Sequence, residues 1–197
     1  MKLIRDSYNK YSKVYNLIFL GISISITLGI ILSFSLDEVI INNMFDYFIE
    51  HITNYNSYTF SNIIYPIIIY IVIFLCSLTI IGVFIPFLAI FIENISIGLI
   101  LGILLKKSML KGFLFGIIYF IITKLLYLII LLYITINLYK FVKTLILSLK
   151  NKNNESIYSL YSKILLRIIF SILAITVYNL LNIFIAPKLI KLFIFLI

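Results

Sequence analysis

The chain has 197 residues, of which 63% are hydrophobic and 12% charged, and its mean hydropathy is +1.21. Soluble domains are about 45–50% apolar and about 25% charged, so this composition excludes an ordinary soluble fold and predicts an all-α polytopic membrane protein with one domain, residues 1–197. The formal net charge of +9 is carried by basic residues beside apolar segments, which is typical of membrane topology signals and not of nucleic-acid binding.

Five apolar segments approach the length of about 20 residues with which an α-helix crosses a bilayer. In chain order they are residues 14–34, 63–81, 87–105, 112–135 and 164–186. The first is long and has no A-x-A-like cleavage site, so we interpret it as a retained span and not as a signal peptide. The basic residues that precede it predict a cytoplasmic N-terminus in a multi-pass protein of the cell membrane: Lys2, Arg5, Lys10 and Lys13.

The segment between the first two spans, residues 35–62, is the acidic part of the chain and is therefore expected on the outer side. Its apolar residues recur at helical spacing, which predicts an amphipathic helix on the outer leaflet. The acidic residues are Asp37, Glu38, Asp46 and Glu50, and the apolar ones are Val39, Ile40, Met44, Phe45, Phe48, Ile49 and Ile52.

The polarity of the middle of the chain conflicts with a simple alternation of spans. Gly82 and Pro86 permit a tight turn between the second and third spans. Alternation then places the next basic cluster, Lys106, Lys107 and Lys111, outside, against the positive-inside rule. Either the rule is violated locally, or the second or third span is re-entrant.

Polar residues also divide the fourth segment. Thr123 and Lys124 lie at its middle, which favours a broken or re-entrant helix. The following residues 137–163 contain several lysines and are predicted to form a cytoplasmic amphipathic extension and loop.

Glycines four residues apart occur in the third and fourth segments, at Gly98 and Gly102 and at Gly112 and Gly116. Small residues at this spacing share one face of a helix and allow a second backbone to approach closely. The two motifs flank a short loop, so they predict a tightly packed helical hairpin. Packing within the chain is the favoured interpretation, and a homodimer is the alternative.

Polar side chains within the predicted spans are the most unusual feature, and they are Glu93, Asn94, Lys124, Asn179 and Asn182. In an antiparallel hairpin Glu93 and Lys124 would lie at similar depth and form an ion pair or line a polar cavity. In the alternative, Glu93 lies at the membrane interface and the Lys124 side chain extends to the headgroups. Thr176, Asn179 and Asn182 share a face, for which interhelical hydrogen bonds are the preferred role and a substrate pathway the bolder one.

Signals for an enzyme are missing from the sequence. His51 is the only histidine and Cys76 the only cysteine, which excludes a Ser/His/Asp set, a histidine cluster, a CxxC motif and an intramolecular disulfide. The HExxH, GxSxG, P-loop and GxGxxG motifs do not occur. We therefore expect no catalytic residues, no cofactor and no metal.

Four stretches of the chain resemble the stage II sporulation protein M family. The block from Phe91 to Gly102 is similar to its glycine-spaced third span, and Lys111-Gly-Phe-Leu114 to the opening of its next segment. Ser77 to Pro86 resembles its turn after the second span, and Asn182-Ile-Phe-Ile-Ala-Pro187 its Glu-Ala-Tyr-Ile-Ser-Pro signature. The chain departs from the family where Asn182 replaces the glutamate, where Thr123–Lys124 replaces a Pro-Gln-Asn break, and where Asn94 replaces a frequent glycine.

The resemblance implies a non-catalytic membrane anchor that holds two peptidoglycan-degrading partners, stage II sporulation proteins P and D, at the septal membrane during engulfment. The outer stretch from Asp37 to Ser61 is then the expected contact surface, because an extracytoplasmic enzyme reaches only that side. The alternative function is a small transporter or channel for a lipid or an ion, which would use Glu93, Lys124, Asn179 and Asn182. A passive subunit of a larger complex is a third possibility.

Overall fold

The computed structural model describes residues 2–53, 84–150 and 157–194, and within the intervening region residues 67–68, 70–72, 75–76 and 79. Within these ranges, side chains are described from residue 12 onward, apart from those of residues 51, 53 and 157. Most of the predicted span 63–81, the polar loop before it and Gly82 therefore lie outside the described residues.

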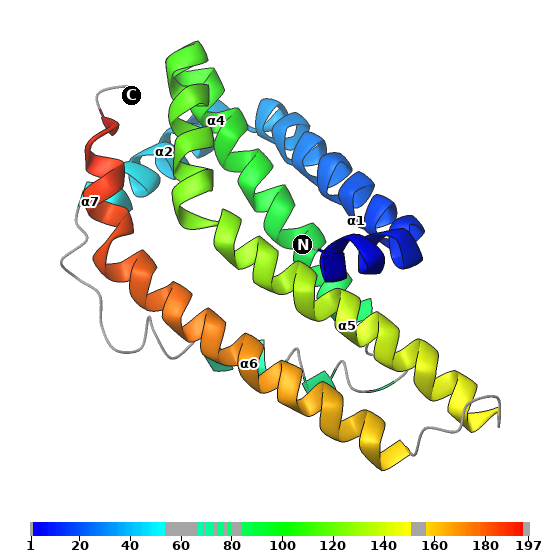
Figure 1. Cartoon of the computed structure of the whole chain (residues 1–197). Coiled ribbons are helices and arrows are strands. Elements are labelled where there is room, and N and C mark those ends of the chain that lie inside the picture. The colour runs from blue at the N-terminus through cyan, green and yellow to red at the C-terminus, as the bar shows by residue number, and fades with distance from the viewer. Residues whose placement is uncertain are drawn as a thin grey trace.

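The described part of the chain is helical and has no strands, so the predicted all-α class is correct (Figure 1). The helices are α1 (Lys2–Ser35), α2 (Glu38–Thr53), α4 (Phe84–Thr123), α5 (Leu125–Leu149), α6 (Ile157–Phe184) and α7 (Ala186–Lys191). Four segments in this part are long and apolar enough to cross a membrane, namely Ser12–Ser35, Phe84–Thr123, Leu125–Leu149 and Tyr158–Phe184. The protein is thus a polytopic helical membrane protein.

Helix α4 is a hairpin of two helical arms, residues 84–107 and 110–123. Ser108 and Met109 leave the helical conformation, and Met109 has a φ of 50°. A Cβ atom added at Gly112 would lie 2.9 Å from the carbonyl carbon of Leu104, and one at Gly116 only 2.6 Å from Leu101 Cδ2. The second arm therefore runs antiparallel to the first and in close contact with it.

Helix α1 packs along the first arm of α4, and the two run in the same direction. Gly29 faces Gly98, and one turn further on Ser33 faces Gly102. At Gly29 and Gly98 backbone lies against backbone, and one turn further on only the small Ser33 side chain lies between the two helices. This is the closest kind of contact that two membrane helices can make.

The helix boundaries differ from the predicted spans in three places. The predicted segment 112–135 is not one helix, because the chain turns at Lys124 between α4 and α5. The third span begins earlier than residue 87, since Pro86 lies in the first turn of α4, where its missing N–H costs nothing. The last span begins at Ile157 and ends at Phe184, and Pro187 starts the separate short helix α7.

The predicted amphipathic extension and loop of residues 137–163 is mostly helix, so the loop is much shorter than expected. Helix α5 continues to Leu149 and α6 starts at Ile157, so within 137–163 only Lys150 and the undescribed residues 151–156 lie outside these helices. The reason is packing, because apolar residues of this region form the core between the two helices. Those residues include Leu138, Phe141, Val142, Leu145 and Leu160.

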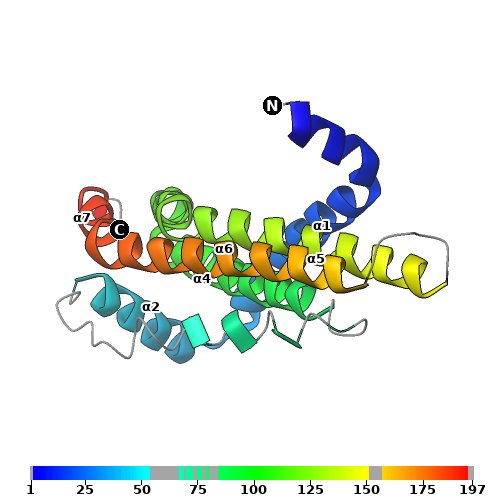
Figure 2. The ribbon, with the colours of Figure 1, turned by 60° about the horizontal axis from the view of Figure 1, so that its bottom comes forward.

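The predicted amphipathic helix exists as α2. Its buried side chains Ile41 and Ile52 alternate with exposed ones such as Val39 and Tyr47. Ile52 packs with Leu104 and Phe115 of α4 and with Ala186 and Ile190 of α7, near the turn of the hairpin. Figure 2 shows α2 below the layer that contains α4, α5 and α6, with α7 at the same end.

Candidate functional site

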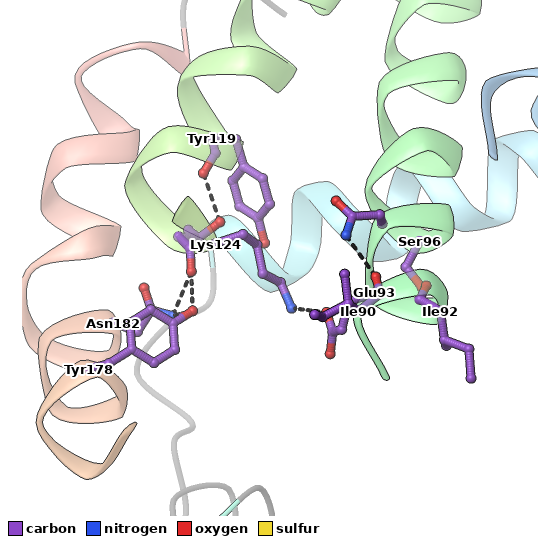
Figure 3. Close-up of polar contacts among 10 residues, drawn as sticks. Ile90, Ile92, Glu93, Ser96, Tyr119, Lys124, Tyr178 and Asn182 are labelled. Atoms are coloured by element: carbon purple, nitrogen blue, oxygen red, sulfur yellow. Dashed lines mark hydrogen bonds and ion pairs between the residues drawn. The ribbon is translucent and has the colours of Figure 1, made fainter. Parts of the chain in front are cut away.

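The turn between α4 and α5 is the centre of the polar contacts inside the bundle. Lys124 Nζ lies 3.0 Å from Glu93 Oε2, and the two side chains come from α4 and from the break after it (Figure 3). The antiparallel hairpin creates this pair, because it sets the second arm beside the first with Lys124 at the depth of Glu93. Their side chains are 33% and 28% exposed, so neither is fully enclosed by the described protein.

Because the helix is interrupted at Lys124, the carbonyl oxygen of Thr123 lies outside the regular hydrogen-bonding pattern of a helix. Two side chains of α6 donate hydrogen bonds to that oxygen, the hydroxyl of Tyr178 and, at 3.1 Å, Nδ2 of Asn182. Asn182 Nδ2 also lies 2.6 Å from the Tyr178 hydroxyl oxygen. Irregular backbone at membrane depth is tolerated when protein groups satisfy it, and α6 does so here.

Thr176 and Asn179, the other polar residues of the predicted face of α6, make no hydrogen bond to another helix among the described residues. Thr176 donates to the carbonyl of Ile172 in its own helix, at 2.9 Å. Asn179 Nδ2 is buried and has no hydrogen-bond partner among the described residues. Only Asn182 of this set thus makes the interhelical hydrogen bond that the sequence favoured.

Asn94, next to Glu93 in sequence, is completely buried. Its Nδ2 donates to the carbonyl oxygen of Ile90 at 2.7 Å, while its Oδ1 has no partner within the described part of the chain. A buried amide of this kind is costly in an apolar surrounding. The amide of Asn94 is therefore only half satisfied by the described residues.

A second polar link between helices was missed in the sequence. Arg167 of α6 donates to Oδ1 of Asn137 of α5 at 2.8 Å, and Asn137 Nδ2 donates to the carbonyl of Tyr133. The signal was present, since Arg167 lies four residues inside the apolar segment 164–186. An arginine at such a position usually finds a partner within the protein.

The glycine motifs contact two different partners. Gly112 and Gly116 face the first arm of the hairpin, whereas Gly98 and Gly102 face α1. The α1 side of this contact was not predicted, although Ser25, Gly29 and Ser33 are small residues spaced by four. Ser25 and Ser33 are fully buried, as expected for an interface of small residues. Pro187 is buried in α7, which packs against α4 and α2.

One small cavity lies beside the ion pair among the described residues. Lys124 lines a cavity of about 70 Å³, whose other walls include Ser96, Gly116 and Tyr119 of the hairpin. Neither Asn179 nor Asn182 lines this cavity. It therefore does not join the ion pair to the amides of α6.

Among the described residues, no three His, Cys, Asp or Glu side chains are grouped so that they could hold a metal ion. The chain matches no protein-family model, no curated protein and no solved structure.

Proposed function

We propose that this protein is a non-catalytic membrane scaffold that positions an extracytoplasmic partner at the cell membrane. The observation that carries the proposal is the backbone contact between α1 and α4 at Gly29 and Gly98. Two helices packed this closely cannot slide or separate without losing van der Waals contacts along the whole interface. A shift at one close atom pair also moves the neighbouring pairs apart. Such a bundle is suited to the role of a rigid scaffold.

The polar groups of the bundle support the same proposal. Glu93 is paired with Lys124, Arg167 with Asn137, and the free carbonyl at the helix break is occupied by Tyr178 and Asn182. In transporters the free backbone groups of broken helices bind the substrate or the coupling ion. Here side chains of the protein bind the free carbonyl instead.

The distribution of charge supports a cytoplasmic N-terminus. Lys13 and Lys143 line one cavity, so the start of α1 and the last third of α5 share one end of the molecule. Lys106 lies at the other end, where its Nζ is 3.4 Å from the carbonyl of Leu36. Acidic residues of the α1–α2 connection and α2 offset the basic cluster there, namely Asp37, Glu38, Asp46 and Glu50. The N-terminal end keeps the excess of positive charge, which under the positive-inside rule supports a cytoplasmic position for it.

This orientation is tested by labelling. In a chain with Cys76→Ser, cysteines introduced at Arg5 and at Asp46 should react with a membrane-impermeant maleimide from opposite sides of sealed vesicles. Labelling of both from one side would refute the orientation and remove α2 from the extracytoplasmic surface.

The partner surface is proposed on α2 and the residues that follow it. Val39 and Tyr47 are 69% and 71% exposed, and an apolar cavity of about 420 Å³ lies between α2 and α4 beside Met44 and Tyr119. By the resemblance to the stage II sporulation protein M family, the partner is a peptidoglycan hydrolase such as stage II sporulation protein P or D. Tethering such an enzyme raises its effective concentration at the membrane without any new catalytic group.

A photo-crosslinking amino acid tests this surface directly. Placed at Val39, it should capture an extracytoplasmic cell-wall hydrolase from intact cells, identified by mass spectrometry. The matched control is the same amino acid at Tyr158, which is 84% exposed at the start of α6. Capture of such an enzyme from neither position, or from Tyr158 alone, would contradict the proposal.

A second candidate function, transport of a lipid or an ion, is favoured by the helix break beside a partly exposed ion pair. Glu93 and Lys124 would then load and release a substrate at membrane depth. Flux through reconstituted vesicles that is abolished by Glu93→Gln, with the folded fraction unchanged, would favour transport over the scaffold.

A further inference from the structure

A large cavity outside the polar site lies between α1, α4 and α5. It has a volume of about 750 Å³, and its walls are mostly apolar side chains such as Leu17, Phe87 and Val142. This is within the range of about 300–1,000 Å³ that is typical of small-molecule sites. The cavity is thus large enough to receive an extended hydrocarbon chain.

Two lysines give this cavity a polar end. Lys13 of α1 and Lys143 of α5 both line it, while none of its lining side chains is acidic. Both lysines are exposed, so a bound group between them would still contact water. Tyr139, an amphipathic side chain of the type that favours the membrane interface, lines the same cavity. The lysines mark the interfacial end, and the apolar walls extend from it.

We propose that this cavity binds one anionic phospholipid from the leaflet on the side of the N-terminal end of α1. The phosphate lies between Lys13 and Lys143, and an acyl chain lies along Leu17 and Phe87. Basic pockets between membrane helices on the cytoplasmic side are typical sites for anionic headgroups, because lysine attracts the phosphate while the helices accept the chain. The site is independent of the scaffold function, since it uses neither α2 nor the ion pair.

The lack of tryptophan in the chain allows a clean measurement. Phe87→Trp places a single indole in the cavity, and its fluorescence is quenched by lipids with brominated acyl chains that bind beside it. The variant is reconstituted in phosphatidylcholine bilayers with increasing fractions of brominated phosphatidylglycerol or brominated phosphatidylcholine. The control is Phe170→Trp on α6, where the native side chain is 62% exposed and outside the cavity.

The proposal predicts that the anionic lipid binds beside position 87 more tightly than the zwitterionic one, by about five-fold for each lysine and about 25-fold for both. At position 170 the two lipids should quench about equally. Lys13→Gln with Lys143→Gln should abolish the preference at position 87. Lys150→Gln with Lys163→Gln removes the same charge outside the cavity and should leave the preference intact.

Three results would overturn the proposal. Equal quenching by the two lipids at position 87 would mean that no anionic headgroup is selected. Lack of quenching by either lipid would mean that protein fills the cavity. A preference that survives the loss of Lys13 and Lys143 would assign the headgroup to other residues, and the single substitutions, each expected to lower it about five-fold, separate this result from misfolding.

Discussion

The contact of α1 with α4 can be tested by adding one methyl group. A Cβ at Gly98 would overlap the carbonyl oxygen of Ile26 and lie 3.0 Å from both the Gly29 Cα and the carbonyl carbon of Ile26, whereas ordinary contacts begin at 3.4 Å. The obstacles are backbone atoms, which cannot rotate away, so Gly98→Ala has to push the two helices apart by a few tenths of an ångström or more.

The cost of that separation follows from the loss of close contacts. Overpacking a close contact costs about 1–3 kcal/mol, and a radial gap of about 0.5–1 Å forfeits a quarter to a half of the dispersion energy of the pairs it separates. Because the clash is with backbone, we expect Gly98→Ala to lower the free energy of unfolding by about 2–3 kcal/mol. This is a change of roughly 30- to 140-fold in the equilibrium constant.

The matched control is Gly21→Ala in α1. Nothing lies within 4 Å of a Cβ built there, so the substitution should not lower stability, and the higher helix propensity of alanine should raise it by up to about 1 kcal/mol. Both variants are measured by equilibrium unfolding in mixed detergent micelles. If Gly98→Ala were as stable as Gly21→Ala, the backbone contact would not exist as described.

Three further predictions concern the hairpin and the break after it. Glu93→Gln leaves Lys124 without its ion-pair partner and should lower the free energy of unfolding by about 1–2 kcal/mol, which is less than for a fully buried charge because the pair is partly exposed. The charge-swapped double variant Glu93→Lys, Lys124→Glu should recover most of this loss in the same unfolding assay. No recovery would exclude direct pairing. Met109→Gly should raise the thermal unfolding temperature, because glycine relieves about 1 kcal/mol of backbone strain at φ 50°. The control Leu110→Gly, in the adjoining helix, should lower that temperature. Equal effects of the two substitutions would show that the turn is unstrained. Tyr178→Phe removes a donor to the carbonyl at the helix break and should cost about 1 kcal/mol in unfolding free energy, and a cost below about 0.2 kcal/mol would argue against that hydrogen bond.

Local patterns predicted the parts of the fold in which neighbouring residues decide the outcome. The helical spacing of apolar residues was sufficient for α2, because one face of that helix is buried and the other is exposed. The polar residues at Lys124 marked the break, and the glycine spacing marked the hairpin. In each case the physical cause lies within a few turns of one segment.

Contacts between distant segments were harder to predict. Gly98 has its partner Gly29 some seventy residues earlier, and no local pattern states which helix a small-residue face will meet. The turn at Ser108 and Met109 contains neither glycine nor proline, so the usual signals of a turn were missing. The length of α5 was underestimated because lysines at its end suggested a loop, whereas packing against α6 keeps these residues helical.

Whether the bundle acts as a rigid scaffold is tested most directly by fixing α1 to α4 with a disulfide. In a chain with Cys76→Ser, the substitutions Ser33→Cys and Gly102→Cys place two thiols across the α1–α4 contact, where a Cβ at position 102 lies 2.8 Å from the Cβ of Ser33. A disulfide requires about 3.5–4.5 Å, so a small separation suffices to form it. Photo-crosslinking from position 39 is then compared in oxidised and reduced membranes. A static scaffold predicts equal capture of the hydrolase in both, and capture that disappears when the disulfide forms would show that the protein has to move.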